Sequence, residues 1–595
     1  MSRSAGDAAR HPRSSAGTTV LAALPGVTVA RRYQARWLSK DVVAGLVLTA
    51  LLVPQGMAYA ELAGLPAVTG LYTSVLCLLA YALFGPSRIL VLGPDSSLGP
   101  MIAATILPLM AADGDPATAI ALSSLLALLV GGFMVLAGVA KLGMVADLLS
   151  KPTQIGYLNG LALTIVVGQL PKLCGFSVDA DGLVAELRGF VDGVVHGETV
   201  PAALAVGSFA LVVILVLQNW FRKVPAVLVA VVLSIVATVA LDLAARGVSL
   251  IGVLPQGFPA FTIPQVSASD LPLLVLGALG IALVALTDTI STASAFSARS
   301  GQEVRANQEM VGIGVANVAA GLFQGFPVST SASRTAVAEQ SGARTQLTGV
   351  VGAAAITVML VALPGLLRNL PNATLAAIVI SAALSLADIG ATRRLWSQRR
   401  AEWVVSTVAF LGVALLGVLP GIALAIAISI LNVFRRAWWP YQARLGQVDG
   451  IDGLHDVTRF DSVAELDGLI VYRFDAPLFF ANTRTFRDQV RHLAASEPPP
   501  RWILLAAEPV TDIDTTAADM LLALHQELAS RGIELAIAEL KDPVRVRLHQ
   551  YGLGQTIAAD RFYRTLDDAI AAYVATYPDA EWRDLGDTTR RDAID

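Results

Sequence analysis

The sequence is short of charge, of cysteine and of histidine. Only 15% of its 595 residues are charged, whereas 55% are hydrophobic and the mean hydropathy is +0.64. Soluble domains carry roughly 25% charged residues, so this composition excludes an ordinary soluble protein and indicates a membrane protein. Two cysteines, Cys77 and Cys174, provide neither a metal-binding spacing nor a disulfide framework. A net charge of −4 gives no reason to expect a nucleic-acid partner.

Motifs for catalysis are also missing. No phosphate-binding loop and no nucleophile–base constellation stands out, so we expect neither an enzyme nor a cofactor. Residues 1–36 lack the basic stretch, apolar run and cleavage site of a removed signal peptide. Because they are rich in Ser, Ala, Gly and Arg, we expect them to form a disordered cytoplasmic tail.

Long apolar runs fill residues 37–440, which we expect to be a transmembrane domain. A span needs roughly 20 apolar residues. Twelve such runs begin near Asp41, Leu65, Ala117, Thr153, Pro201, Val224, Leu271, Asn307, Gln346, Asn372, Trp403 and Gly421. Two shorter segments, at about 97–111 and 330–340, are too broken for ordinary spans and are predicted to be partial helices. The prediction is therefore an α-helical membrane protein of fourteen segments.

Basic residues support this even number, which puts both chain ends on one side. They occur at the positions expected to be cytoplasmic: Arg31, Arg32, Arg36, Lys40, Lys141, Lys151, Arg222, Lys223, Arg299, Arg305, Arg393, Arg394, Arg399, Arg400, Arg435 and Arg436. The loop expected outside, at about 175–200, instead carries Asp179, Asp181, Glu186, Asp192 and Glu198 with one Arg188. Positive charge marks cytoplasmic loops, so both ends are predicted to be cytoplasmic.

The two partial helices follow matching Gly/Pro breaks. Gly93-Pro94 and Gly325-Phe326-Pro327 are about 233 positions apart, close to the spacing of about 230 between the first spans of the two halves. Each half holds seven segments, an odd number, so the two repeats must be inverted relative to each other. A matched pair of interrupted segments is a strong sequence indication of a transporter's binding site.

The second break carries a cation and several hydroxyl groups. Arg334 follows Ser329, Thr330, Ser331 and Ser333. An arginine at membrane depth is costly unless it pairs, meets water or binds an anion. We predict an anion site in which Ser329 caps the partial helix. The alternatives are a structural ion pair for Arg334, for example with Glu339, and hydroxyls that bond to their own helix.

The first break supplies Asp95, Ser96 and Ser97. Two helix N-termini that face one cavity add their positive ends at one anion. Asp95 opposes that field if it points at the site, so we expect it to act as the N-cap of its own helix. Ser96 and Ser97 are predicted to contact the anion.

Two further spans carry polar residues. Asp288 lies in an apolar span with Thr292 one turn later, and proton uptake or Na⁺ binding by this pair would couple a cation to the anion. A salt bridge from Asp288 to Arg334 is the structural alternative. In the first span, Gln55 and Tyr59 lie on one helix face and are predicted to reach the same cavity.

The character of the sequence changes after Arg436. We expect a polar linker at 441–457, an α/β domain at 458–580 and a tail at 581–595. Strands are predicted at 469–472, 502–506 and 533–537, and helices at 483–495, 515–531 and 544–551, because apolar alternation and helical periodicity follow each other there. This domain is expected to be cytoplasmic.

At this point the motifs resemble a known family. Residues 54–60, continued by 62–66 and 70–72, resemble the signature of sulfate permease (SulP) anion transporters, and 323–335 resemble the tenth-segment motif of that family. Residues 512–518 resemble the core of a STAS domain. The resemblance covers nearly the whole chain after the N-terminal tail.

The resemblance implies a seven-plus-seven inverted repeat with core and gate domains, a homodimer and elevator-like alternating access. It implies an anion site between the third and tenth segments, beside Gln55 and Tyr59. Asp288 and Thr292 match a spacing that binds Na⁺ in bicarbonate members, whereas a carboxylate in that segment is linked to H⁺ in sulfate members. Asp514 is followed by Thr515 and Thr516 rather than Ser and Gly, so a STAS interaction module is expected more than a phosphoswitch, with dimer contact as the alternative.

We therefore predict a secondary active transporter of a small inorganic oxyanion in the cell membrane. Sulfate is the expected substrate, with H⁺ or Na⁺ symport, and Na⁺-dependent bicarbonate transport is the alternative. A membrane-anchored STAS sensor is the alternative of another class, and the intact pair of interrupted segments argues against it. An uncoupled anion channel is disfavoured by the negative charge of Asp288. A regulatory protein is a possible partner of the STAS domain.

Overall fold

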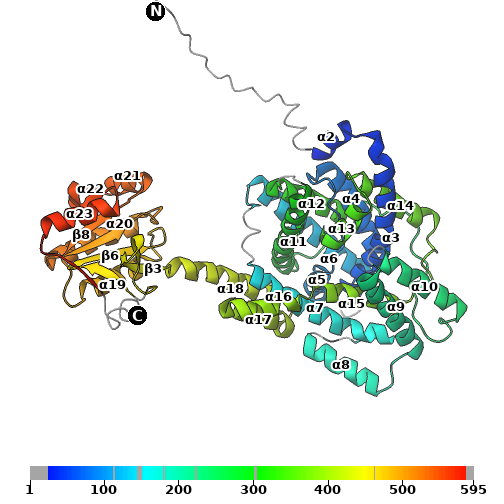
Figure 1. The fold of residues 1–595 in the computed structure, drawn as a ribbon. Helices are drawn as coiled ribbons and strands as arrows, with labels where there is room; N and C mark the ends of the chain where they lie inside the picture. The colour runs from blue at the N-terminus through cyan, green and yellow to red at the C-terminus, as the bar shows by residue number, and fades with distance from the viewer. Residues whose placement is uncertain are drawn as a thin grey trace, which may run out of the picture. The chain divides into compact units, whose positions relative to one another are not determined.

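The structure is a computed structural model that describes residues 24–110, 114–143, 150–178, 180, 182–221, 224–300, 304–460 and 462–584 (Figure 1). It divides into two compact units, Met1–Ser429 and Ile430–Asp595. Several positions used in the sequence predictions lie outside the described residues: most of the N-terminal tail (1–23), the end of the C-terminal tail (585–595), Asp179, Asp181, Arg222, Lys223 and the side chain of Arg299.

Helices occur at all fourteen predicted segments of the first unit. They are α3 (Leu38–Leu62), α4 (Ala67–Phe84), α5 (Gly99–Ile106), α6 (Pro116–Val139), α7 (Lys151–Cys174), α9 (Pro201–Trp220), α10 (Ala226–Ala240), α11 (Leu271–Ser300), α12 (Ala306–Leu322), α13 (Ala332–Gln340), α14 (Leu347–Ala362), α15 (Asn372–Leu386), α17 (Arg400–Leu416) and α18 (Val418–Trp438). In the described residues, seven helices are long and apolar enough to cross a membrane by length and composition alone.

Local sequence explains many helix ends. Pro116 and Pro201 each stand at the first position of a helix, where the missing N–H of proline costs nothing. Asp115 caps α6 by accepting a hydrogen bond from the Ala117 N–H. Gly175 ends α7 in the left-handed region at φ 89°, which glycine adopts without strain.

The helices of this unit pack as two groups. The first group contains α3, α4, α5, α6, α11, α12, α13 and α14, and the second contains α7, α9, α10, α15 and α17. Within the first group, α3 and α4 approach so closely that a Cβ on Gly70 would lie 1.9 Å from the Gly56 carbonyl oxygen. Glycine at 56 and 70 therefore serves a close helix crossing. These two groups correspond to the predicted core and gate.

Apolar side chains also cover the outside of the helices. Val212 on α9, Val232 and Val236 on α10, and Leu136 on α6 are all exposed. Exposed apolar surface on this scale is typical of helices that face lipid.

Five regions predicted as loops, linker or tails contain regular structure instead. Residues 25–31 of the predicted tail form α2 (Pro25–Arg31). The predicted outer loop contains α8 (Leu183–Val195), and α16 (Ile389–Gln398) precedes α17. The prediction of a linker at 441–457 is wrong, since these residues form β3 (Gln442–Val448) and β4 (Ile451–Asp456). The predicted C-terminal tail contains β10 (Trp582–Asp584).

The second unit is built on an eight-stranded sheet. Its other strands are β5 (Ala464–Leu466), β6 (Leu469–Phe474), β7 (Trp502–Ala506), β8 (Glu534–Ala538) and β9 (Phe562–Tyr563), in the order β10-β5-β3-β6-β7-β8-β9, with β4 beside β3. β6, β7, β8 and β9 run parallel, whereas β3 pairs antiparallel with β6. The strands and helices predicted at 469–551 are all present.

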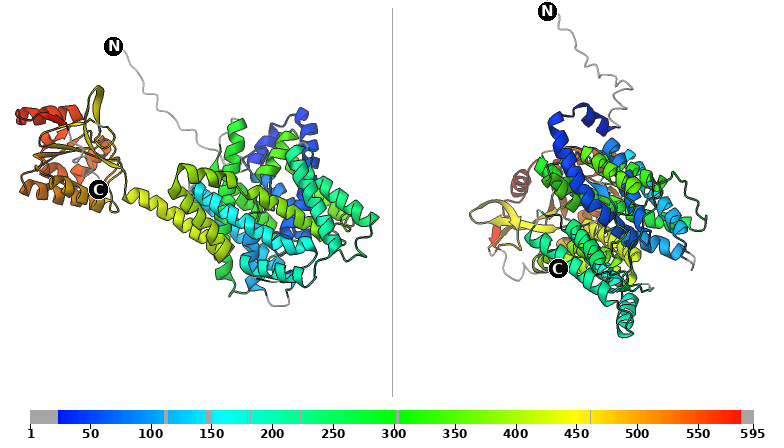
Figure 2. Two further views of the ribbon diagram at one scale, coloured as in Figure 1. Left: turned by 60° about the horizontal axis from the view of Figure 1, so that its bottom comes forward. Right: turned by 90° about the vertical axis from the view of Figure 1, so that its right-hand side faces the viewer.

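Helices cover both faces of this sheet (Figure 2). α19 (Thr483–Ala494), α20 (Thr515–Ser530) and α21 (Asp542–Gln550) bury one face, in a core with Phe486, Leu524 and Leu548. α23 (Leu566–Thr576) buries the other face, where Tyr573 packs with Trp502. Alternate strand residues therefore point into two cores, as expected for central parallel strands.

Candidate functional site

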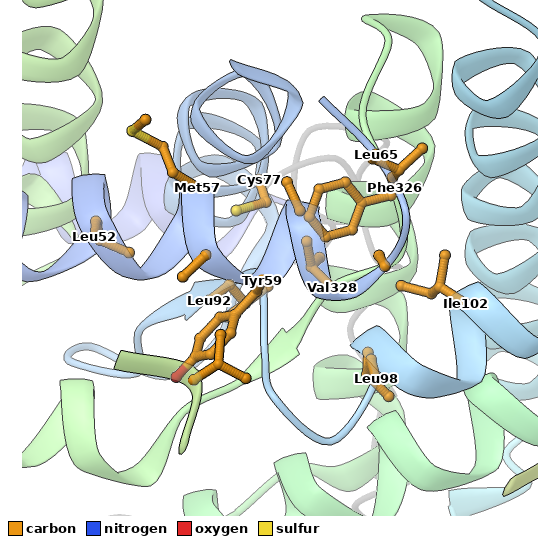
Figure 3. Packing of buried hydrophobic residues seen from close by; sticks show 14 of the residues in the cluster. Leu52, Met57, Tyr59, Leu65, Cys77, Leu92, Leu98, Ile102, Phe326 and Val328 are labelled. Atoms are coloured by element: carbon orange, nitrogen blue, oxygen red, sulfur yellow. The ribbon is translucent and has the colours of Figure 1, made fainter. Parts of the chain in front are cut away.

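The two interrupted segments meet each other in the first unit. β1 (Leu92–Gly93) pairs antiparallel with β2 (Ser329–Thr330), with Leu92 opposite Thr330 and Gly93 opposite Ser329. α5 follows β1 and α13 follows β2, so the two partial helices begin at one crossing. Figure 3 shows Tyr59, Leu92, Leu98, Phe326 and Val328 gathered in the apolar packing around it.

Neighbouring helices hold the second break. Asn317 of α12 accepts a hydrogen bond from the Val328 N–H at 2.9 Å and donates to the Val328 carbonyl at 3.2 Å. Thr73 of α4 accepts from the Phe326 N–H, and Ser124 of α6 donates to the Gly325 carbonyl. The break in the helix therefore leaves its backbone groups paired, as burial requires.

Residues of the second half hold the first break. The Thr335 hydroxyl accepts from the Val91 N–H, and the Gln346 amide donates to the carbonyls of Ser87 and Leu90. The Ser331 N–H donates to the Val91 carbonyl. Each repeat is thus fixed by the other at the crossing.

Arg334 lies at the centre of this crossing and is only 1% exposed. Its Nη1 donates to the Pro94 carbonyl at 2.6 Å, and its Nη2 lies 3.8 Å from Oδ2 of Asp95. Nε and Nη2 are buried and have no hydrogen-bond partner among the described residues. The arginine therefore bridges the two halves and keeps two donors available.

The hydroxyl cluster begins α13 in a different way from the prediction. Ser331, not Ser329, is the N-cap and accepts from the Arg334 N–H. Ser329 is wrong as the cap because the chain stays extended through Thr330 to pair with β1. Thr330 donates instead to Thr289 of α11. Ser333 is exposed and lies 3.1 Å from the Ser331 hydroxyl.

Asp95 likewise does not cap α5 directly. Its Oδ1 accepts from the Ser97 N–H, whereas Leu98 is the N-cap of the helix. The chain makes one additional turn between β1 and α5, and Asp95 closes that turn. Its second oxygen faces Arg334.

Ser97 links two carboxylates. Its hydroxyl lies 2.9 Å from Oδ1 of Asp95 and 3.0 Å from Oδ2 of Asp288. A hydroxyl donates one hydrogen bond at a time, so it cannot satisfy both carboxylates. The structural alternative for Asp288, a salt bridge to Arg334, is not the observed contact, because Asp288 instead accepts from Ser97 in the turn before α5.

The remaining predicted residues lie around this centre. Tyr59 of α3 is buried, within the electrostatic reach of Asp95 and Arg334. Gln55 is half-buried one turn earlier, and Thr292 is buried one turn after Asp288. Asp288 and Thr292 provide the oxygen ligands that Na⁺ prefers. In the described residues there is no cluster of three or more His, Cys, Asp or Glu side chains for another metal.

Sequence reasoning missed two residues of the site. The hydroxyl of Tyr157 on α7 is buried without a partner among the described residues, within the electrostatic reach of Asp95 and Asp288. Nothing in the sequence marks it, because a tyrosine in an apolar helix is ordinary. Asn317 is fully buried in α12. A single amide side chain within an apolar run could have indicated a residue of the site.

Comparison with known proteins agrees with this architecture. Residues 38–409 match the sulfate permease family and residues 462–569 match the STAS domain. The chain is 41% identical over 552 residues to a protein named probable sulfate transporter in Mycobacterium tuberculosis, covering 92% of this chain and 98% of that one. It is 30% identical to the chloroplastic sulfate transporter 4.1 of Arabidopsis thaliana, covering 89% of this chain and 79% of that one.

Solved structures share the fold. The murine Solute Carrier 26 family member A9 anion transporter, in its inward-facing state, superposes with a TM-score of 0.87 at 22% identity over 97% of this chain and all of that one. The transmembrane domain of a cyanobacterium bicarbonate transporter, BicA, superposes with a TM-score of 0.58 at 23% identity over 67% of this chain and 98% of that domain. From its sequence and its architecture, the chain belongs to the sulfate permease family of multi-pass membrane transporters and ends in a STAS domain.

Proposed function

We propose that this protein is a secondary active transporter that moves sulfate together with H⁺ or Na⁺. The observation that carries the proposal is the crossing of β1 and β2, where two helix N-termini, hydroxyl groups and the buried Arg334 meet. Helix N-termini and an arginine fork are the groups that bind oxyanions. The names of the relatives in Mycobacterium tuberculosis and Arabidopsis thaliana favour sulfate among oxyanions.

Asp288 is proposed as the cation-coupling residue. It is half-buried in α11 and is joined through the Ser97 hydroxyl to the turn that begins the anion site. A cation bound or a proton taken up at Asp288 lowers the negative charge next to the anion, so the two ions bind better together than separately.

Alternating access is proposed to be elevator-like. The predicted anion and cation residues lie on α3, α5, α11 and α13 or just before them, all in the first helix group. Tyr157 lies on α7, in the second group. A displacement of the first group along the second would carry the whole site with it. The contacts that change would be those between the two groups, such as those of Tyr157.

Na⁺-dependent bicarbonate transport is the second candidate. The observation in its favour is that Asp288 and Thr292 present oxygen ligands on successive turns of α11. We further propose a homodimer in the cell membrane, with the N-terminus and the STAS domain cytoplasmic and with the STAS domain contacting a regulatory protein.

Uptake into proteoliposomes tests the proposal. We expect labelled sulfate to accumulate under an imposed inward H⁺ or Na⁺ gradient, and unlabelled sulfate to compete better than bicarbonate. Separate pH and Na⁺ gradients identify the coupling ion. Accumulation of bicarbonate but not of sulfate would show that bicarbonate is the substrate. The absence of flux for either anion under both gradients would contradict the transporter proposal.

A further inference from the structure

Asp95 occupies the side of Arg334 where an anion is expected. Its carboxylate lies at ion-pair distance from Nη2, 3.8 Å away, but makes no hydrogen bond to it. Nη1 of Arg334 is already used by the Pro94 carbonyl. The guanidinium is therefore held in place and electrically balanced, yet two of its nitrogens stay unsatisfied in a buried position.

Those two nitrogens, Nε and Nη2, form one edge of the guanidinium. An arginine edge of this kind binds a carboxylate or an oxyanion through two parallel hydrogen bonds. Leaving buried donors unpaired is unfavourable. The site thus contains a donor pair that a tetrahedral oxyanion satisfies and that Asp95, tied to Ser97, does not.

We propose that Asp95 is a tethered competitor of the transported anion and a second coupling carboxylate. When the site is empty, Asp95 balances the charge of Arg334. When an oxyanion binds through Nε and Nη2, it replaces Asp95 as the counter-charge of Arg334. A monovalent cation must then balance Asp95. This inference rests on the proposed function and adds one coupled cation to the one assigned to Asp288.

The surroundings of Asp95 explain why the cation has to come from solution rather than from another side chain. The groups that face it are Arg334 from α13, Asp288 from α11 across Ser97, and the phenols of Tyr59 on α3 and Tyr157 on α7. Arg334 is the single cation in this set. Once the anion has bound to Arg334, the released carboxylate is half-buried next to like charges, which is unfavourable.

The shared Ser97 hydroxyl brings the two proposed coupling carboxylates together. It lies within hydrogen-bond distance of Asp95 and of Asp288 but has only one proton to donate. Before the anion arrives, Arg334 balances Asp95 and the cation assigned to Asp288 balances the other carboxylate, so the pair is short of one positive partner only once the anion has bound to Arg334. A proton or Na⁺ at this position corrects that shortage.

The test measures how many cations accompany each sulfate. Purified full-length protein is reconstituted in liposomes with the membrane potential held at zero, and the equilibrium accumulation of labelled sulfate is measured against a pH gradient or a Na⁺ gradient. Each coupled cation multiplies the accumulation about tenfold per tenfold gradient. We expect about 100-fold for the wild type and about tenfold for Asp95→Asn, under whichever gradient drives transport.

Two matched variants control for charge and for folding. Asp95→Glu keeps the carboxylate and is expected to keep the 100-fold dependence. Asp115→Asn removes an exposed aspartate in the same half, at a helix N-cap where asparagine serves equally well, and should also behave like the wild type. A merely structural Asp95 would change yield and rate in Asp95→Asn but not the gradient dependence.

A tenfold dependence in the wild type, or a 100-fold dependence retained in Asp95→Asn, overturns this inference while the proposed function stands. No sulfate flux in the wild type overturns both. If Asp95→Asn does not fold, cation uptake on sulfate binding by the wild type in detergent decides the question. Two cations per sulfate support the inference and one contradicts it.

Discussion

The two interrupted segments share an order of elements but have opposite chemistry. Each consists of a short strand followed by a partial helix, and the two strands pair with each other. The first segment carries the carboxylate Asp95, whereas the second carries the cation Arg334 and a run of hydroxyl groups. The repeat therefore determines where the two helix N-termini meet, and the substituted side chains determine what binds there.

They also differ in how they are held. Asn317, Thr73 and Ser124 fix the second break from helices α12, α4 and α6. The first break depends on Thr335 and Gln346, which belong to the second half. The two breaks have similar numbers of hydrogen bonds, but the second directly precedes Arg334, so its supports determine the position of that cation.

The largest expected effect comes from removing the cation of the second segment. We expect Arg334→Ala to lower sulfate uptake about 100-fold or more, because it removes the anion partner and leaves the half-buried Asp95 without its counter-charge. Arg334→Lys should restore part of the activity, since it keeps the charge but not the two-donor edge. Initial uptake rates measure this, with Arg368→Gln, an exposed arginine of the same half, as control. Normal uptake by Arg334→Ala would make Arg334 structural.

The next effect concerns the coupling carboxylate that faces the first segment. Asp288→Asn should lower the cation-driven accumulation of sulfate about tenfold per tenfold gradient, because one coupled cation is lost. Asp242→Asn is the matched control, since Asp242 is exposed and its positive φ of 47° suits asparagine as well. Accumulation by Asp288→Asn equal to that of the wild type would remove Asp288 from the coupling mechanism.

A smaller effect separates the supports of the two segments. Asn317→Leu leaves the N–H and the carbonyl of Val328 unpaired, at a cost of about 1–3 kcal/mol for each group. We expect a lower melting temperature and a weaker apparent affinity for sulfate. Gln346→Leu, which frees the carbonyls of Ser87 and Leu90 at the first break, should lower the melting temperature with less effect on affinity. Equal losses of affinity would contradict the assigned difference between the two breaks.

The smallest effect lies in the STAS unit. Hydrogen bonding from Arg491 holds the pKa of Glu527 below its ordinary value, with further support from the charge of Arg491 and of Arg531. A lowered folded-state pKa stabilises the fold above the unfolded pKa and loses that contribution as the pH falls through the folded pKa. Glu527 is 25% exposed and its partner Arg491 is 44% exposed, so solvent screens the pair and the contribution is below about 1 kcal/mol.

Hydrogen exchange checks this contribution at the level of one helix. Glu527→Gln should weaken protection of α20 at pH 7, and the difference from the wild type should fade in acid as Glu527 becomes protonated. A difference that persists at acidic pH would mean that packing rather than charge is responsible.

The sequence predicted the elements well because their signals are local. Apolar length marks the spans, Gly and Pro mark the breaks, and alternating periodicity marks the STAS strands at 469–472, 502–506 and 533–537. It failed at 441–457, since β3 and β4 are polar in part and become strands only by pairing with β6 and with each other. It also predicted the wrong N-cap for α13. The backbone at Thr330 stays extended because it pairs with Leu92, which is far away in the sequence.

By itself, the sequence determined that the chain is a membrane protein with two matched breaks, a buried arginine and an intramembrane carboxylate, because composition, spacing and turn residues act locally. The tertiary structure alone decided the partners: Arg334 with Pro94 and Asp95, and Ser97 between Asp95 and Asp288. Those pairs join residues up to 240 positions apart, as in the bond from Arg334 to Pro94. No local preference encodes such contacts, since they exist only where the two repeats cross and exclude water.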